Sequence, residues 1–187
     1  MRTSIFNHLR RLIYSLRNNR GCNDQGTNTL QCLRSASIET LTLAGSQVLS
    51  ARPATLYVFA PILDGDFIRE RPVEALKSGI FARVPVLFGS NSDEGSSWSA
   101  TLADPSANTS MPSATEDTVF NFLQGQYPTL THASFDDAVE LYPLKDYENS
   151  FSLQGQQMYG ECRYICTASM ITGAEISESN TKVFQYQ

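Results

Sequence analysis

The chain has 187 residues, of which 41% are hydrophobic and 10% aromatic, so it can bury the core of one domain of ordinary size. A net charge of −5 argues against nucleic-acid binding, because proteins that bind nucleic acid present a basic surface. No apolar run approaches the roughly 20 residues that a membrane-spanning helix needs. Composition therefore indicates a globular α/β-sized domain and leaves its chemistry open.

The first 34 residues differ in charge from the rest of the chain. They contain six Arg and a single acid, Asp24, a pattern that also occurs in targeting peptides. No apolar region of a secretory signal follows, so no cleaved signal is visible. The spacing of apolar residues favours instead an amphipathic helix over residues 4–16. A misplaced start of the chain is a third explanation of this segment.

Short helices and strands are predicted from residue 37 onward. Ser37 has the residue type and position of a helix N-cap. Residues 56–61 are apolar and rich in β-forming types, and the Asp-Gly pair at 64–65 predicts a turn after them. Residues 71–79 predict a compact helix, because proline stands in the first turn and glycine past the end.

A strand is predicted at residues 84–89, which are apolar without interruption. Continuous rather than alternating apolarity is typical of a strand that is buried on both faces of a parallel sheet. Pro85 must then lie at its start, where no ladder donor is needed. The polar turn 90–95 follows at the carboxyl end of this strand, where open α/β sheets carry their chemistry.

The second half of the chain is predicted to be mostly helical. Residues 100–117 are polar and predict a surface loop, and their Asn108-Thr109-Ser110 triplet is an N-glycosylation acceptor if the chain is secreted. Periodic segments predict helices at 118–124, 134–141 and about 154–172, and residues 182–187 predict a strand.

The four cysteines fall into two pairs. Cys162 and Cys166 are four residues apart in a predicted helix, where they are expected to be small buried apolar residues. A zinc site would need two more ligands, and no His or other Cys is near them in the sequence, so no metal is predicted. Cys22 and Cys32 bracket a polar loop, which a disulfide would stabilise by about 2–3 kcal/mol; two ordinary thiols are the alternative.

The two histidines offer little material for catalysis. His8 and His132 are far apart in the sequence, and neither lies in a recognisable catalytic motif. His132 precedes a predicted helix, where a solvated or helix-capping role is expected.

Several motifs occur in an order that identifies a family. They are Gly21-Cys22 with Thr29–Arg34, Phe59–Ile68, Pro72–Gly89 and Asn91–Gly95, followed by Leu141-Tyr142-Pro143 and Val183–Tyr186. Together they resemble the type-B carboxylesterases, which include the cholinesterases and fungal lipases of the α/β-hydrolase fold. The resemblance covers residues 21–187 as a partial carboxylesterase domain and leaves residues 1–20 as an unmatched basic segment. It implies an α/β class with an incomplete α/β-hydrolase fold, in which part of a central, mostly parallel sheet is surrounded by helices.

The resemblance also implies a role for Glu94. In this family the acid of the catalytic triad lies in the Asp-Glu-Gly turn, where it can accept the N–H of an imidazole and hold one tautomer. The alternative is that Asp93 and Glu94 only cap the turn that follows. The resemblance further implies a Cys22–Cys32 disulfide, secretion, and a small-molecule ester or lipid as substrate of the complete parent protein, with no cofactor and no metal.

Two other parts of the family pattern do not occur in the printed sequence. It contains no Gly-x-Ser-x-Gly motif, and no His follows Lys182. The chain is therefore predicted to be a C-terminal-side fragment of a serine hydrolase and to be inactive by itself, because the triad members act as a unit. The alternatives are a non-catalytic interaction module on the same fold, or a small hydrolase that uses Ser96 or Ser97 with Glu94.

Overall fold

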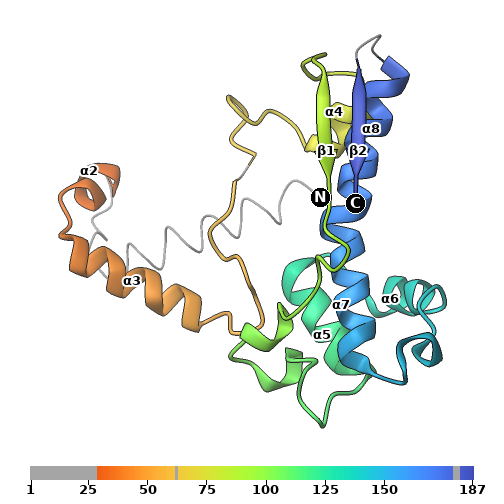
Figure 1. Ribbon diagram of the computed structural model, residues 1–187. Helices are drawn as coiled ribbons and strands as arrows, with labels where there is room; N and C mark the ends of the chain where they lie inside the picture. Colours follow the sequence, from red (N-terminus) through yellow and green to blue (C-terminus); the bar gives the residue numbers. More distant parts are fainter. Residues whose placement is uncertain (1–28, 62, 179–181) are drawn as a thin grey trace. The chain divides into compact units, whose positions relative to one another are not determined.

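The computed structural model describes residues 29–61, 63–178 and 182–187, and these belong to two compact units, Met1–Ile62 and Leu63–Gln187 (Figure 1). The predicted helix at 4–16, His8, Cys22 and the predicted boundary between residues 20 and 21 lie outside the described residues. Within the described parts, no helix is both long enough and apolar enough to span a membrane.

The described part of the first unit, residues 29–61, contains two helices, α2 (Thr29–Arg34) and α3 (Ile38–Ser50). The Ser37 hydroxyl accepts a hydrogen bond from the Thr40 amide at 3.3 Å, so Ser37 caps α3 as predicted. The strand suggested by residues 56–61 is wrong, because these residues are irregular. A strand needs a neighbouring strand to pair with, and the sheet of the described residues consists of β1 and β2 in the second unit.

The second unit begins with α4 (Pro72–Lys77), and the predicted compact helix is confirmed. Its end is a Schellman motif: the Gly79 amide donates to the carbonyl of Leu76 at 3.2 Å, and the Ile80 amide donates to that of Ala75 at 2.8 Å. This motif requires a left-handed residue, and Gly79 has a φ of 68°.

The predicted strands pair with each other in a two-stranded parallel sheet. Strand β1 (Val86–Gly89) lies beside β2 (Val183–Tyr186), with Val86 opposite Val183 and Gly89 opposite Tyr186 (Figure 1). Pro85 stands just before β1, as predicted. The Val86 amide donates to the Lys182 carbonyl and the Ser90 amide to the Tyr186 carbonyl, so the ladder extends one residue before β2 and one residue past β1.

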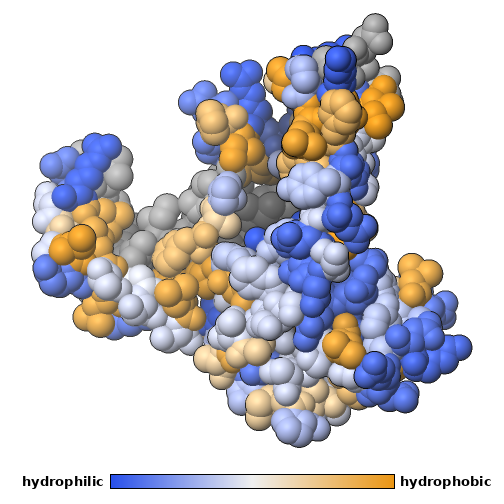
Figure 2. All heavy atoms as spheres, in the orientation of Figure 1, coloured by the Kyte–Doolittle hydropathy of each residue, from blue (hydrophilic) through white to orange (hydrophobic). Residues whose placement is uncertain are grey.

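One face of this sheet is open, which corrects the expectation of a strand buried on both sides. Leu87, Phe184 and Tyr186 are 69%, 60% and 57% exposed, and apolar surface is visible over the strands in Figure 2. Helix α8 (Cys166–Glu178) packs against both strands, and the Thr172 hydroxyl donates to the Gln185 side chain at 2.7 Å. The burial prediction is wrong because the described sheet has two strands and a helix that covers one face.

The core of the second unit is built by the middle helices. These are α5 (Glu116–Gln126), α6 (His132–Val139) and α7 (Phe151–Gly160), with a 3-10 turn, η3 (Leu144–Tyr147), before α7. Hydroxyl side chains mark the start of all three helices: Thr131 and Ser150 accept from the amides of Ser134 and Leu153, and at α5 the Thr115 amide donates to the Thr118 hydroxyl at 3.0 Å. Buried side chains from α5 and α7 meet here, among them Val119, Phe122, Leu123, Met158 and Tyr159.

The predicted long helix at 154–172 is confirmed and is longer than expected. Helix α7 continues through a π-helical turn, η4 (Glu161–Ile165), into α8 (Figure 1). The expected burial of Cys162 and Cys166 is wrong, because both thiols are free and exposed. In α8 the buried face follows Ala168, Thr172 and Glu175, and Cys166 precedes Ala168 by two residues, which places it on the opposite side.

The predicted surface loop at 100–117 contributes to the core, so this prediction is also partly wrong. It contains two short 3-10 turns, η1 (Ser99–Thr101) and η2 (Pro105–Ala107). Leu102, Ala107 and Thr109 are buried, and the Thr109 hydroxyl lies 2.6 Å from that of Ser99. The polar composition of this segment predicted exposure, but its small and polar side chains fill the space against α5 and α7.

A matched pair of Phe→Ala substitutions separates the core from the open sheet face. Phe122→Ala should lower the free energy of unfolding by about 3–5 kcal/mol, because this side chain is 1% exposed and would leave a cavity. Phe184→Ala should change it by about 1 kcal/mol or less, since much of the ring is already in water. Urea unfolding followed by fluorescence of Trp98, the single Trp of the chain, measures both. Equal losses would show that the sheet face is covered in solution.

Candidate functional site

The turn after β1 contains Glu94, the residue that the resemblance implies as a triad acid. The chain leaves the carboxyl end of β1 toward α5 and α7 (Figure 1). Ser90 is buried and its amide bonds to the Tyr186 carbonyl at 3.2 Å, so the sheet fixes the start of the turn. Within the turn the Ser96 amide donates to the Asp93 carbonyl at 3.3 Å.

The Glu94 side chain bends back toward the strand. Its Oε1 accepts a hydrogen bond from the Asn91 backbone amide at 2.7 Å and another from Asn91 Nδ2 at 3.1 Å. Glu94 is half-buried, and among the described residues all hydrogen bonds of its carboxylate go to Oε1. The carboxylate therefore does not cap the residues that follow it, and its Oε2 is available to a further N–H donor.

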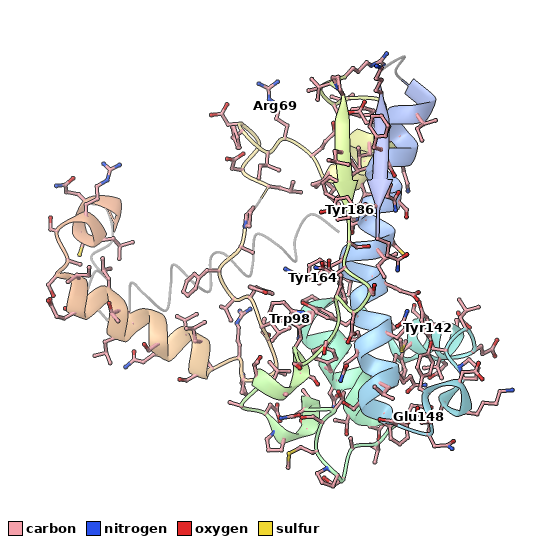
Figure 3. All side chains as sticks on the ribbon, in the orientation of Figure 1. Arg69, Trp98, Tyr142, Glu148, Tyr164 and Tyr186 are labelled. Carbon is pink, nitrogen blue, oxygen red and sulfur yellow. The ribbon has the colours of Figure 1, made fainter. Side chains whose placement is uncertain are left out.

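The main chain of Glu94 is held from the other direction by Trp98. The indole N–H of Trp98 donates to the Glu94 carbonyl at 2.8 Å. The ring itself packs edge-on against the buried Tyr159 of α7, with 6.3 Å between ring centroids. Figure 3 shows Trp98 and Tyr164 on one side of the long helix and Tyr142 on the other. The half-buried side chain of Trp98 thus links the turn to the core.

Gly95 makes the closest contact between the turn and α7. A Cβ atom placed on Gly95 would overlap the carbonyl oxygen of Gln156 and lie 2.6 Å from its carbonyl carbon. A Cβ atom on Gly160 would likewise lie 2.7 Å from the Gly95 amide nitrogen. The two backbones can approach this closely only because both residues lack a side chain.

The serines after Glu94 lie in the same turn. Ser96 and Ser97 are exposed, their hydroxyl oxygens are 3.5 Å apart, and Ser97 has a positive φ of 62°. Neither hydroxyl is hydrogen-bonded to Glu94 in the described part of the chain. Among the described residues, the Glu94 carboxylate is thus bonded to Asn91 and to neither serine.

His132 is the first residue of α6, directly after the cap Thr131. It is exposed, and its ring stacks on Phe120, with 3.7 Å between centroids and 20° between planes. The predicted solvated position at a helix start is confirmed, and the stacking is an additional packing role.

A second cluster of polar groups surrounds the π-helical turn. The Tyr142 hydroxyl and the Gln157 amide both donate to the Glu161 carboxylate, and the buried Gln154 amide donates to the Tyr142 carbonyl at 2.8 Å. Burial, and next the hydrogen bond to Glu161, raise the pKa of Tyr142 well above its usual range. Burial also raises the pKa of Tyr127 to about 12. These tyrosines therefore stay neutral at physiological pH, and the cluster fastens the loop before α7 to the long helix.

The glycosylation acceptor and the first cysteine pair lie apart from this turn in the sequence. Asn108 is half-buried, and its Oδ1 accepts a bond from the Ser110 amide at 3.0 Å, so the triplet forms a tight turn. Cys32 takes part in a disulfide. Its predicted partner Cys22 lies outside the described residues, so this pairing stays a prediction. No group of three or more potential metal-ligating side chains occurs in the described ranges.

Comparison with known proteins identifies the family. Residues 3–187 match the carboxylesterase family over nearly the whole chain, beginning within the segment that the sequence motifs left unmatched. The chain belongs to the carboxylesterase family. This membership implies the α/β-hydrolase fold, and the described helices with a small parallel sheet are compatible with part of that fold.

Individual relatives are similar over shorter stretches. The chain is 30% identical to lipase 2 of Geotrichum candidum over 130 residues, which are 66% of this chain and 22% of the lipase. It is 35% identical to acetylcholinesterase of Bungarus fasciatus over 77 residues, 41% of this chain and 13% of that enzyme. A match to human thyroglobulin, 33% identical, covers 35% of this chain and 2% of thyroglobulin. The chain spans about a fifth or less of the length of these relatives.

Three residues that hold this turn in place were not predicted from the sequence. Asn91 occurs in the motif that carries the resemblance, yet its bonds to Glu94 were not expected. Trp98 and Gly160 were not singled out either. The only signal for Gly160 is a glycine in the middle of a strong helical pattern, which commonly marks a close backbone approach.

The contact at Gly95 can be tested with a matched glycine. Gly95→Ala should lower the free energy of unfolding by about 3 kcal/mol or more, because backbone atoms of α7 cannot move aside as a flexible side chain can. Gly173→Ala is the control: it lies in α8 with nothing within 4 Å of the new methyl group, so it should be neutral or stabilise by about 1 kcal/mol. Thermal unfolding of both variants measures this. A harmless Gly95→Ala would show that the turn does not rest on α7.

Proposed function

We propose that this chain is the part of a carboxylic-ester hydrolase that carries the acid of a Ser–acid–His triad, and that the acid is Glu94. The observation that supports it is the carboxylate at the end of β1, with Oε1 bound twice by Asn91 and Oε2 available. A carboxylate fixed in this way can accept the N–H of an imidazole, hold one tautomer, and stabilise the imidazolium formed when the base takes the serine proton.

The serine and the imidazole of this proposed triad come from outside the printed residues. The printed sequence contains no Gly-x-Ser-x-Gly elbow, His132 is stacked on Phe120, and His8 is outside the described residues. The chain alone is then inactive, since an orienting carboxylate without nucleophile and base accelerates nothing. The substrate class proposed for the complete protein is a small-molecule carboxylic ester or a lipid, in keeping with the carboxylesterase family.

We also propose that the complete protein is secreted. A Cys22–Cys32 disulfide and a glycan on Asn108 would both fit a secreted protein. No cofactor and no metal take part in this proposed chemistry, because the serine, the imidazole and the carboxylate are sufficient.

The decisive experiment uses the polypeptide encoded by the uninterrupted gene. Its sequence should contain a Gly-x-Ser-x-Gly before this chain and a His after it. In that polypeptide Glu94→Gln should lower kcat for a p-nitrophenyl ester by about 10³- to 10⁴-fold, because the amide holds the wrong tautomer. Glu116→Gln, at an exposed position in the first turn of α5, is the control and should leave kcat unchanged.

Two results would contradict the proposal. One is a gene that encodes neither missing motif, which would favour the non-catalytic module. The other is labelling of Ser96 or Ser97 in the 187-residue chain by a fluorophosphonate probe, which would favour a small independent hydrolase.

A further inference from the structure

The two hydrogen bonds that Asn91 donates to Glu94 have a consequence beyond the assignment of the acid. The geometry points to Asn91 as a positioning residue, whose side-chain amide selects which oxygen of the Glu94 carboxylate faces a partner. This inference rests on the proposed function only for the identity of that partner, an imidazole N–H. The positioning itself is a property of the 187-residue chain.

The backbone of Glu94 is fixed without help from the Asn91 side chain. The Trp98 indole holds the Glu94 carbonyl at 2.8 Å, and Gly95 is pressed against the carbonyl of Gln156. What these contacts leave free is the Glu94 side chain, which has three rotatable bonds and is only half-buried. A carboxylate that rotates freely would present either oxygen, and in many directions.

Asn91 removes this freedom at one oxygen. The backbone amide and Nδ2 of Asn91 approach Oε1 at 2.7 and 3.1 Å, so one residue occupies two acceptor positions of the same oxygen. The NH₂ end of the Asn91 side chain must face Glu94, because its carbonyl end could not donate a hydrogen bond to a carboxylate. With Oε1 held from two directions, Oε2 projects in one defined direction.

The amide side chain, and not the backbone donor alone, makes this orientation specific. A single N–H···O contact fixes the distance but leaves the carboxylate free to swing about it, whereas two donors at an angle to each other limit that rotation. Asn91 is exposed, so in the absence of Glu94 its amide would bond to water. The contact therefore contributes to where Glu94 points far more than to the stability of the turn.

The test measures the reactivity of Glu94 in the 187-residue chain. A water-soluble carbodiimide with glycine ethyl ester modifies accessible carboxyl groups, and peptide mass mapping gives a rate for each one. In Asn91→Ala the rate at Glu94 should rise about threefold to tenfold, because one of two hydrogen bonds to the carboxylate is lost. Asn91→Ser, which keeps a donor, should restore part of the protection.

Two controls separate positioning from a general loosening of the turn. Asn121→Ala removes an asparagine that donates from Nδ2 to the Ser106 carbonyl at 3.1 Å, and it should leave the Glu94 rate unchanged. The emission of Trp98, the single Trp of the chain, reports the backbone of the turn and should stay at the wild-type wavelength in Asn91→Ala.

Two results would rule out a positioning role for the Asn91 side chain. An unchanged Glu94 rate in Asn91→Ala would overturn the inference, and so would a faster rate accompanied by a red shift of Trp98, since Asn91 would then act through the backbone. Neither result depends on ester hydrolysis. A failure of the hydrolase proposal would appear in the kcat of Glu94→Gln instead, so the two failures are distinguishable.

Discussion

The contact between Gly95 and the end of α7 is the constraint on which the candidate site depends. Two backbones pass so closely that neither Gly95 nor Gly160 can carry a side chain. Because α7 is anchored by Met158 and Tyr159 in the core, this contact gives the turn after β1 a rigid support. Trp98 adds a second attachment to the same helix through Tyr159. Glu94 therefore lies between two fixed points, the carboxyl end of a strand and the side of a helix.

The same helix joins this site to the sheet. Helix α7 continues through the π-helical turn into α8, which packs on β1 and β2. A π-turn inserts extra backbone into a helix and shifts the faces that follow it, and here it is also where Glu161 receives the bonds of Tyr142 and Gln157. The open face with Leu87 and Phe184 is the part of this arrangement that parallel sheets normally cover.

The features that could be predicted from the sequence are those that local interactions determine. Hydroxyl caps such as Ser37, and the proline and glycine that bracket α4, act within a few residues and can be recognised from the order of residues alone. The burial predictions were wrong where contacts between distant parts of the chain determine exposure. The exposure of Leu87 depends on the number of neighbouring strands, and the exposure of Cys162 depends on the faces of a helix whose π-turn has no clear sequence signal. The role proposed for Glu94 rests on the resemblance, and its hydrogen bonds to Asn91 are visible only in the structure.

The contacts of Gly95 and Trp98 make the turn that carries Glu94 part of the cooperative fold of the second unit, oriented before any partner binds. Hydrogen exchange of the Trp98 indole N–H, compared with the backbone amides of α7, tests this claim most directly. The indole proton should be protected, and urea should abolish its protection together with that of α7, because one cooperative unit holds both. An indole proton that exchanges at the rate of free indole while α7 stays protected would contradict it.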